Sequence, residues 1–232
     1  MNRLLQKLSF TALIFLVFTI SSIAQSTLPK VETDAVLVMT DGTERAVIMR
    51  MTSANYNQPV YQVHDLGEKK FKKLNTKDVE KIILNTRDGE QHILLLFPTV
   101  LPKGRKKSQV SDGKVMVLLK WQGENCVAGF AGMYYLRPKD GSLVTKYDPT
   151  FGTMLIFRDL RNEKGVMLGY TNPRKNEGDV LKMNNMAKMM LAPYNVYFEE
   201  VCSKFLEEYP CTFENEFNIQ EFMENYEATC SN

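Results

Sequence analysis

The sequence predicts an α+β protein: antiparallel β-meander units with a sandwich or barrel-like shape, followed by three C-terminal helices. Two observations lead to this class. Between residues 35 and 170, short runs of β-forming residues alternate with Asp-Gly pairs, a combination typical of hairpins. After residue 178 the spacing of apolar residues changes from two to about 3.6, the period of a helix. Almost no helical pattern precedes residue 179, so a parallel βαβ arrangement is not favoured.

The composition is that of an ordinary globular protein. Of 232 residues, 44% are hydrophobic and 24% are charged, which excludes collagen-like, coiled-coil and wholly disordered chains. The 29 Lys and Arg residues nearly balance 27 Asp and Glu residues. A chain with so little net charge is not expected to bind nucleic acid over its whole surface.

The first 24 residues have the three parts of a secretory signal. Arg3 and Lys7 come first, a mostly apolar run follows over residues 8–20, and small residues stand at Ser22 and Ala24. As a helix this run spans about 20 Å, less than the roughly 30 Å of a bilayer core. A signal peptide is therefore favoured over a membrane anchor.

We expect cleavage after Ala24 and export of the mature chain to the periplasm or out of the cell. Gln25 follows the predicted cleavage site, where a lipoprotein would have cysteine, so no lipid anchor is expected. No later stretch is long and apolar enough to predict a transmembrane segment.

Four Asp-Gly pairs mark predicted turns between strands. A type I′ hairpin turn needs positive φ at both central residues, and Asp-Gly is a favoured pair for it. The pairs stand at residues 41–42, 88–89, 112–113 and 140–141. The predicted strands cover residues 35–39, 46–51, 82–84, 93–97, 115–121, 131–136, 154–157 and 165–170.

Residues 98–107 interrupt this pattern. Pro98 and Pro102 accompany a basic run at residues 103–107 that has no apolar periodicity, so we expect a linker or long loop. The predicted parts of the chain are a signal peptide (1–24), an N-terminal β-unit with this linker (25–108), a second β-unit (109–178) and a helical, cysteine-containing segment (179–232).

Three helices are expected in this last segment. The first has Asp179 as its cap and ends at Pro193, and the second covers residues 194–209 and ends at Pro210. The first helix has one apolar face, made of Met183, Met186, Ala187 and Met190.

The third helix has the clearest start. Asn218 and Glu221 have the spacing of a capping box, and Phe217 and Phe222 occupy the positions of a hydrophobic staple. We therefore expect the helix to begin at Asn218 and to run toward Cys230.

The chain has four cysteines, Cys126, Cys202, Cys211 and Cys230. In an oxidising compartment an even number favours disulfides, although four cysteines allow three full pairings. If the second and third helices pack antiparallel, Cys202 and Cys230 approach one another, and we favour that pairing. A bond between Cys211 and Cys230 requires the third helix to run away from the turn. No zinc-binding spacing is present.

Few residues indicate catalysis. The sequence lacks G-x-S-x-G, H-E-x-x-H and phosphate-loop motifs, and we expect its two histidines, His64 and His92, to face solvent. The methionines of the first predicted helix, joined by Met189, are suitable Cu(I) ligands, but their helical spacing favours core packing. We therefore predict no enzyme activity, no cofactor and no metal site. The alternative is a carboxylate-dependent hydrolase of envelope glycan or peptide, which needs no sequence motif.

Charge is unevenly distributed along the chain. Residues 25–195 carry a net charge of +8 and residues 196–232 one of −8. We expect a surface for an anionic partner in the basic part, made of Lys69, Lys70, Lys72, Lys73, Arg105, Lys106 and Lys107. The predicted function is a non-catalytic exported module that binds a protein or an anionic envelope polymer, and not nucleic acid.

Short segments spread over most of the chain form a recognisable combination. They are Ala24-Gln25, Asp41-Gly42, residues 78–83, Trp121-Gln122-Gly123, residues 133–136, residues 205–211, Asn225-Tyr226 and Cys230. In these features the chain resembles a broad group of exported proteins of unknown function from Bacteroidetes-type bacteria. The resemblance implies export and a β-region followed by a helical tail. It implies no activity, ligand or site residue.

Overall fold

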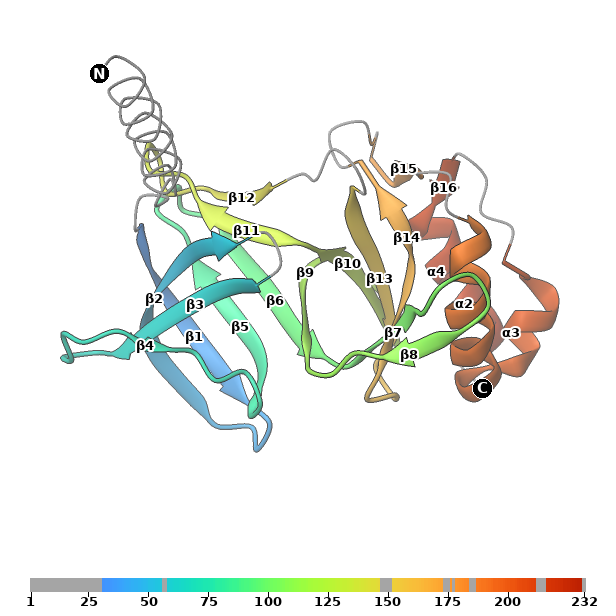
Figure 1. The fold of residues 1–232 in the computed structure, drawn as a ribbon, viewed down its shortest axis with the longest axis horizontal. Helices are drawn as coiled ribbons and strands as arrows, with labels where there is room; N and C mark the ends of the chain where they lie inside the picture. Colours follow the sequence, from blue (N-terminus) through green and yellow to red (C-terminus); the bar gives the residue numbers. More distant parts are fainter. Residues whose placement is uncertain are drawn as a thin grey trace, which may run out of the picture.

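A computed structural model describes most of the chain, and the predicted signal peptide lies outside the described part. The described residues are 31–55, 58–146, 152–172, 176, 178–183, 187–211 and 216–230. Strands occupy the chain up to residue 182, and the described helices follow, with one further strand at Glu216–Asn218 (Figure 1). The α+β class is confirmed.

One sheet of twelve strands forms the body of the protein. Its spatial order is β4 (Lys72–Lys73), β3 (Gln58–Asp65), β2 (Glu44–Asn55), β1 (Glu32–Met39), β5 (Val79–Asn85), β6 (Gln91–Phe97), β9 (Val115–Gln122), β10 (Cys126–Ala131), β13 (Thr153–Asp159), β14 (Gly165–Thr171), β7 (Thr99–Pro102) and β8 (Ser108–Val110). Neighbouring strands pair antiparallel, except that β14 and β7 pair parallel. The predicted antiparallel meander is therefore confirmed, with one parallel pair among the described strands.

Three of the four Asp-Gly pairs turn hairpins, but none does so in the expected conformation. Gly42 and Gly89 have φ values of 82° and 87°, whereas no described residue other than glycine has positive φ. The β1–β2 and β5–β6 loops therefore contain a single left-handed residue, as in a three-residue hairpin loop, and the predicted type I′ turn is wrong. The pair at residues 112–113 connects β8 to β9, which do not pair with each other.

The buried apolar residues form three cores. One, which includes Phe157, Phe198 and Phe222, packs the helices against β10, β13 and β14, and the other two meet on opposite faces of β9. In β9, Leu118 belongs to the core enclosed by β1–β6, and the preceding residue Val117 belongs to a second core. The second core draws one residue from each of five strands, namely Phe97, Val117, Ala131, Ile156 and Met167. We call β1–β6 with their core the first lobe, and β7, β8, β10, β13 and β14 with the helices the second lobe.

A small hairpin completes the first lobe. Strands β11 (Met133–Leu136) and β12 (Leu143–Lys146) pair with each other. Tyr134 and Leu136 are buried in the core of the first lobe, so the hairpin covers it. Tyr134 also donates its hydroxyl hydrogen to the carbonyl of Phe130 and accepts the backbone N–H of Leu118 at 3.3 Å.

The predicted linker at residues 98–107 is instead part of the sheet. β7 pairs with β14 at Val100, and β8 folds back on β7 to form an edge hairpin. The two prolines misled the prediction, because Pro98 lies between β6 and β7 and Pro102 ends β7, two positions where a strand tolerates proline.

Helices α2 (Ala187–Val201), α3 (Ser203–Glu208) and α4 (Ile219–Cys230) cover the second lobe (Figure 1). Pro193 lies inside α2, so the predicted helix end at Pro193 is wrong. A proline removes one helical hydrogen bond. The packing of Met190, Tyr194 and Phe198 on either side of it buries the helix against the sheet and outweighs that loss.

The start of the first helix is also wrong as predicted, because residues after Asp179 form a strand. β15 (Val180–Lys182) pairs with β16 (Glu216–Asn218) just before α4. Asp179 accepts the indole N–H of Trp121 at 2.6 Å, and its carbonyl accepts the backbone N–H of Ile219 at 3.0 Å. Asp179 thus anchors the beginning of α4 rather than capping α2.

The predicted start of α4 is confirmed. The Asn218 side chain accepts the backbone N–H of Glu221 at 3.2 Å, which is an N-cap bond. The rings of Phe217 and Phe222 lie 5.2 Å apart, so the hydrophobic staple is formed. Within the described residues, no helix is both long and apolar enough to cross a membrane.

Candidate functional site

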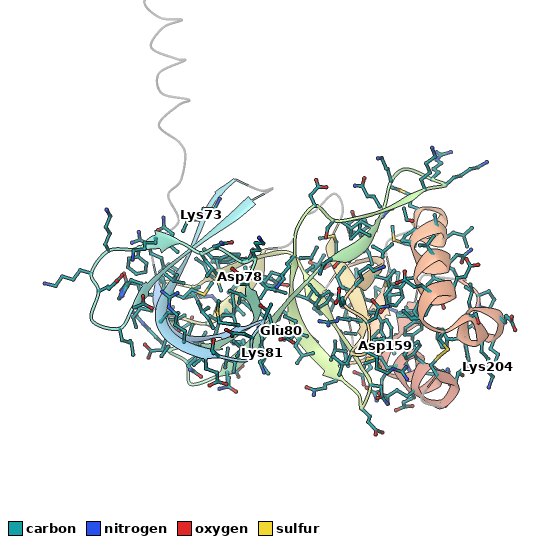
Figure 2. All side chains as sticks on the ribbon, turned by 90° about the horizontal axis from the view of Figure 1, so that it is seen from below. Lys73, Asp78, Glu80, Lys81, Asp159 and Lys204 are labelled. Carbon is teal, nitrogen blue, oxygen red and sulfur yellow. A yellow bond between two sulfur atoms is a disulfide. The ribbon has the colours of Figure 1, made fainter. Side chains whose placement is uncertain are left out.

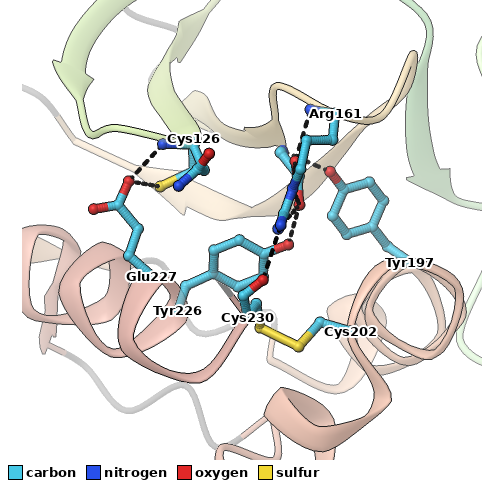
Figure 3. A network of polar contacts seen from close by, with 9 residues as sticks. Cys126, Arg161, Tyr197, Cys202, Tyr226, Glu227 and Cys230 are labelled. Atoms are coloured by element: carbon cyan, nitrogen blue, oxygen red, sulfur yellow. Dashed lines mark hydrogen bonds and ion pairs between the residues drawn. A yellow bond between two sulfur atoms is a disulfide. The ribbon is translucent and has the colours of Figure 1, made fainter. Parts of the chain in front are cut away.

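A buried polar network joins the β13–β14 hairpin to α4 (Figure 3). At its centre is Asp159, the last residue of β13, whose side chain is only 3% exposed. The carboxylate accepts hydrogen bonds from Arg161 at 2.7 Å (Nη2) and 3.0 Å (Nε), and from the Tyr226 hydroxyl at 2.5 Å. The backbone N–H of Asp159 donates to the Tyr197 hydroxyl at 2.9 Å. The β13–β14 turn and α4 therefore meet at the carboxylate of Asp159, and α2 is bonded to the backbone of the same residue.

The same arginine reaches the end of the chain's last described helix. Arg161 Nη1 donates to the carbonyl of Cys230 at 2.9 Å. Cys230 is bonded to Cys202, with a Cα–Cα distance of 6.0 Å, so the favoured pairing is confirmed. No disulfide joins Cys126 to Cys211 in the described part of the chain, although the even number of cysteines had favoured two disulfides.

Two opposing effects set the pKa of the Asp159 carboxyl. Burial raises the pKa of this carboxyl, but the hydrogen bonds from Arg161 and Tyr226 outweigh burial, and the pKa lies below its ordinary value. Burial and the neighbouring carboxylate raise the pKa of Tyr226. The carboxylate of Asp159 stays ionised, the hydroxyl of Tyr226 stays protonated, and each is already hydrogen-bonded. This arrangement fits a structural role, and we call Asp159, Arg161 and Tyr226 the clamp.

A second carboxylate holds the other side of α4. Glu227 accepts the backbone N–H of Asn125 at 2.8 Å and the Cys126 thiol at 3.6 Å (Figure 3). Burial, followed by the charge of Glu227, raises the pKa of the Cys126 thiol. A protonated, buried thiol is a poor nucleophile, so Cys126 acts as a packing residue.

The predicted basic surface is divided between two places. Lys69, Lys70, Lys72 and Lys73 lie exposed at the β3–β4 hairpin of the first lobe, and we call them the β3–β4 lysines. Lys72 pairs with Glu68 at 3.1 Å. Figure 2 shows Lys73 in the first lobe, far from Lys204 on the helices. Lysine is also common on edge strands such as β4, where it discourages pairing with another chain.

The other predicted residues, Arg105, Lys106 and Lys107, lie at the tip of the β7–β8 hairpin. We call residues 103–107 the basic hairpin; all five are exposed. The Lys103 N–H donates to the carbonyl of Lys107 at 2.7 Å, which closes the turn. No ion pair joins this hairpin to a carboxylate in the described part of the chain.

The two basic segments do not form one surface. β4 and β8 are the two outer strands of the twelve-stranded sheet, at its opposite edges. Figure 1 shows β8 beside α2 in the second lobe, whereas β4 lies at the far end of the first lobe. The sequence could not show this separation, because it depends on the order of the strands in the sheet.

One of the two histidines is not where it was expected. His64 faces away from the core, and its Nδ1 lies 2.8 Å from the Asp65 carbonyl. His92 was predicted to face solvent, but its side chain is only 15% exposed and its Nε2 is buried. Burial and the nearby charge of Lys120 lower the pKa of His92. The prediction failed because His92 shares the inward face of β6 with Leu94.

The predicted helical face of methionines is wrong, because Met183 precedes α2 and forms a β-bridge with Thr171. Met183 and Met190 are buried, and Met189 packs against the second core. Met186 lies outside the described residues. No group of three His, Cys, Asp or Glu side chains in the described residues is arranged to hold a metal ion.

Comparison with family models, curated proteins and solved structures found no match. The resemblance to exported proteins therefore stays a prediction from the sequence.

Proposed function

We propose that the protein is a non-catalytic exported module that binds an anionic polymer of the cell envelope through the basic hairpin. The observation that carries this proposal is the composition of the hairpin. Four of its five residues are cationic, none is acidic, and all are exposed without an ion-pair partner among the described residues.

The basic hairpin is fixed to the rest of the fold by strand pairing and by contacts with α2. β7 pairs with β14 through Val100, and Val100 itself is buried. α2 packs against both β7 and β8 (Figure 1). A supported hairpin loses less conformational entropy on binding than a free loop, which favours affinity.

The β3–β4 lysines are a weaker candidate for the same partner. Glu68 lies in the same hairpin and pairs with Lys72, so one of the four lysines is already neutralised. Asp65, which pairs with Arg45 of β2, adds a second carboxylate to this hairpin. The basic hairpin has no such internal acid. We therefore expect the β3–β4 lysines to contribute less, and they provide a matched control.

A polymer-binding measurement tests the proposal. We would measure binding of labelled polyphosphate and labelled polyglutamate to the wild type and to two triple variants, R105Q/K106Q/K107Q and K69Q/K70Q/K73Q. We expect the first variant to weaken binding at least tenfold at low salt and the second to weaken it less than threefold. Equal losses in the two variants, or no binding at low salt, would contradict the proposal.

Two further readouts complete this test. Electrostatic binding should weaken as salt shortens the Debye length from about 10 Å at 0.1 M to about 3 Å at 1 M. Export is tested separately, by N-terminal sequencing of the protein after expression of the full chain. We expect a mature chain that begins at Gln25, and a retained residue 1 would contradict export by the predicted signal.

A further inference from the structure

The first lobe has an open groove on its outer face that the proposed function does not use. Its volume is about 550 Å³, and it is lined in part by Glu32, Asp34, Ile48, His64 and Arg87. This volume lies within the roughly 300 to 1,000 Å³ of small-molecule sites. A bare metal ion would not fill it, and the described residues provide no metal-binding group of three.

Two carboxylates stand side by side in this groove. Glu32 and Asp34 are exposed on β1, and Thr33 between them is buried, so the two carboxylates share the outer face. Residues two apart on a strand are separated by about 6.8 Å. A single ammonium group placed between them can reach both.

The arginine that is paired with Glu32 across the β1–β2 ladder does not neutralise these carboxylates. Arg50 lies opposite Glu32 on β2. Its Nε donates to Gln62 at 2.6 Å, and its guanidinium lies 3.9 Å over the ring of Phe71. Neither Glu32 nor Asp34 forms an ion pair with another described residue.

The rest of the groove suits a short hydrocarbon chain. Ile48 lies between Asp34 and His64 in the register across β1, β2 and β3. The rings of His64 and Phe71 pack edge to face, with ring centroids 4.5 Å apart. Arg87 adds one positive charge to the lining, so a ligand with a single ammonium group fits better than a polycation.

We propose that this groove binds an aliphatic primary amine. The ammonium group lies between Glu32 and Asp34, and the hydrocarbon chain lies over Ile48. The amine is either a free small molecule or a lysine side chain of a partner protein. Charge-assisted hydrogen bonds to two carboxylates supply the specificity, and Ile48 supplies apolar contact.

NMR titration of the purified protein tests this site directly. The probes are n-pentylamine, its uncharged analogue 1-pentanol, and the peptide acetyl-Ala-Ala-Lys-Ala-Ala-amide. We expect n-pentylamine to shift the backbone amide signals of residues 32–34, 48 and 64, and 1-pentanol to bind at least tenfold more weakly. Binding of the peptide as well identifies a lysine side chain as a ligand, and binding of n-pentylamine alone identifies a free amine.

Matched variants separate the groove from general charge effects. We expect D34N to raise the Kd for n-pentylamine at least tenfold and E32Q to raise it severalfold. E44Q removes an exposed carboxylate at the other end of the β1–β2 pair and should change the Kd less than twofold. Equal binding of 1-pentanol, equal effects of E44Q and D34N, or the absence of shifts at these residues would overturn the proposal. The triple variant R105Q/K106Q/K107Q should bind n-pentylamine normally, so the two proposals fail independently.

Discussion

Arg45 and Asp65 in the first lobe and Arg161 and Asp159 in the second lobe form two arginine–aspartate pairs that differ in the burial of the aspartate. Arg45 and Arg161 have the same side-chain exposure, 47%. Asp65 in the first lobe is 37% exposed, whereas Asp159 in the second lobe is 3% exposed. The same two residue types therefore form a solvated surface pair in one lobe and a clamp in the other. The surroundings of the carboxylate therefore decide what such a pair contributes.

Removing the buried pair should have the largest effect. In R161M the carboxylate of Asp159 loses its guanidinium partner while it stays buried, and methionine keeps most of the apolar stem. Breaking a buried ion pair costs about 3 kcal/mol or more of unfolding free energy. Urea unfolding followed by circular dichroism measures this loss. Because Tyr226 still donates to Asp159, we expect the lower end of that range.

The double variant R161M/D159N provides the internal control. It removes the buried charge as well as its partner, so it should recover part of the stability that R161M loses. A double variant less stable than R161M would show that the carboxylate contributes through contacts other than the arginine.

Removing the disulfide tests whether the polar network around Asp159 is sufficient to hold α4 against the sheet. Cys202 and Cys230 are 28 residues apart in sequence, and a crosslink of that span contributes about 3 kcal/mol by restricting the unfolded chain. We expect the variant C202S/C230S to lose about this amount in urea unfolding under non-reducing conditions. C126S, which leaves the bond intact, should not reproduce the loss. If the double variant were as stable as the wild type, the clamp at Asp159 would suffice to hold α4.

Acid should weaken the clamp, and the pH range of this loss should identify Asp159 as the group responsible. The pKa of Asp159 is lowered in the folded protein, so its ionised form stabilises the fold above pH 4, and this contribution is lost as the pH falls through the folded pKa. In R161M burial dominates, and the carboxyl takes up its proton at a higher pH. We therefore expect the difference in unfolding free energy between wild type and R161M to shrink between pH 6 and pH 3. A constant difference over this range would exclude Asp159 as its source.

Local signals in the sequence predicted much of the fold. Turns at Gly42 and Gly89, the cap at Asn218 and the staple at Phe217 depend on residues close in sequence, and all four are present. The strand pairing of β7 with β14 is not local, because Val100 meets Val166. Prolines beside that strand therefore suggested a linker, since nothing nearby indicated its partner.

The clamp shows why sites are harder to predict than elements. Asp159 and Tyr226 are 67 residues apart, and neither has a motif around it. Cys202 and Cys230 were predictable because helix geometry limits which cysteines can meet. The basic residues were found by composition, but composition could not show that the sheet places them at opposite edges. The carboxylates of the groove gave a signal, two acids at alternate positions of β1, that was not used.

A smaller effect is expected at the other end of α4. In N218A the backbone N–H of Glu221 loses its capping acceptor, which costs about 1 kcal/mol. Asn218 caps the opposite end of α4 from Cys230, and the helix between them spans about 18 Å, so its effect should add to that of R161M. Urea unfolding of N218A, R161M and the combined variant measures both the loss and its additivity. N218S, which retains a capping oxygen, should keep most of the stability.

The exposed pair of the first lobe should give the smallest effect. R45M makes the same substitution as R161M, at an arginine of equal exposure, and breaks two hydrogen bonds to Asp65. Here water can solvate the carboxylate after the arginine is removed, so we expect no measurable change in the urea midpoint of unfolding. Measured together, the two variants compare arginines of equal exposure whose Nε and Nη2 both bind an aspartate. Arg161 differs in one further bond, from Nη1 to the carbonyl of Cys230, and the main difference is the burial of the aspartate. If R45M and R161M were equally destabilising, burial of the carboxylate would not be the cause, and the clamp would be no more than a surface pair.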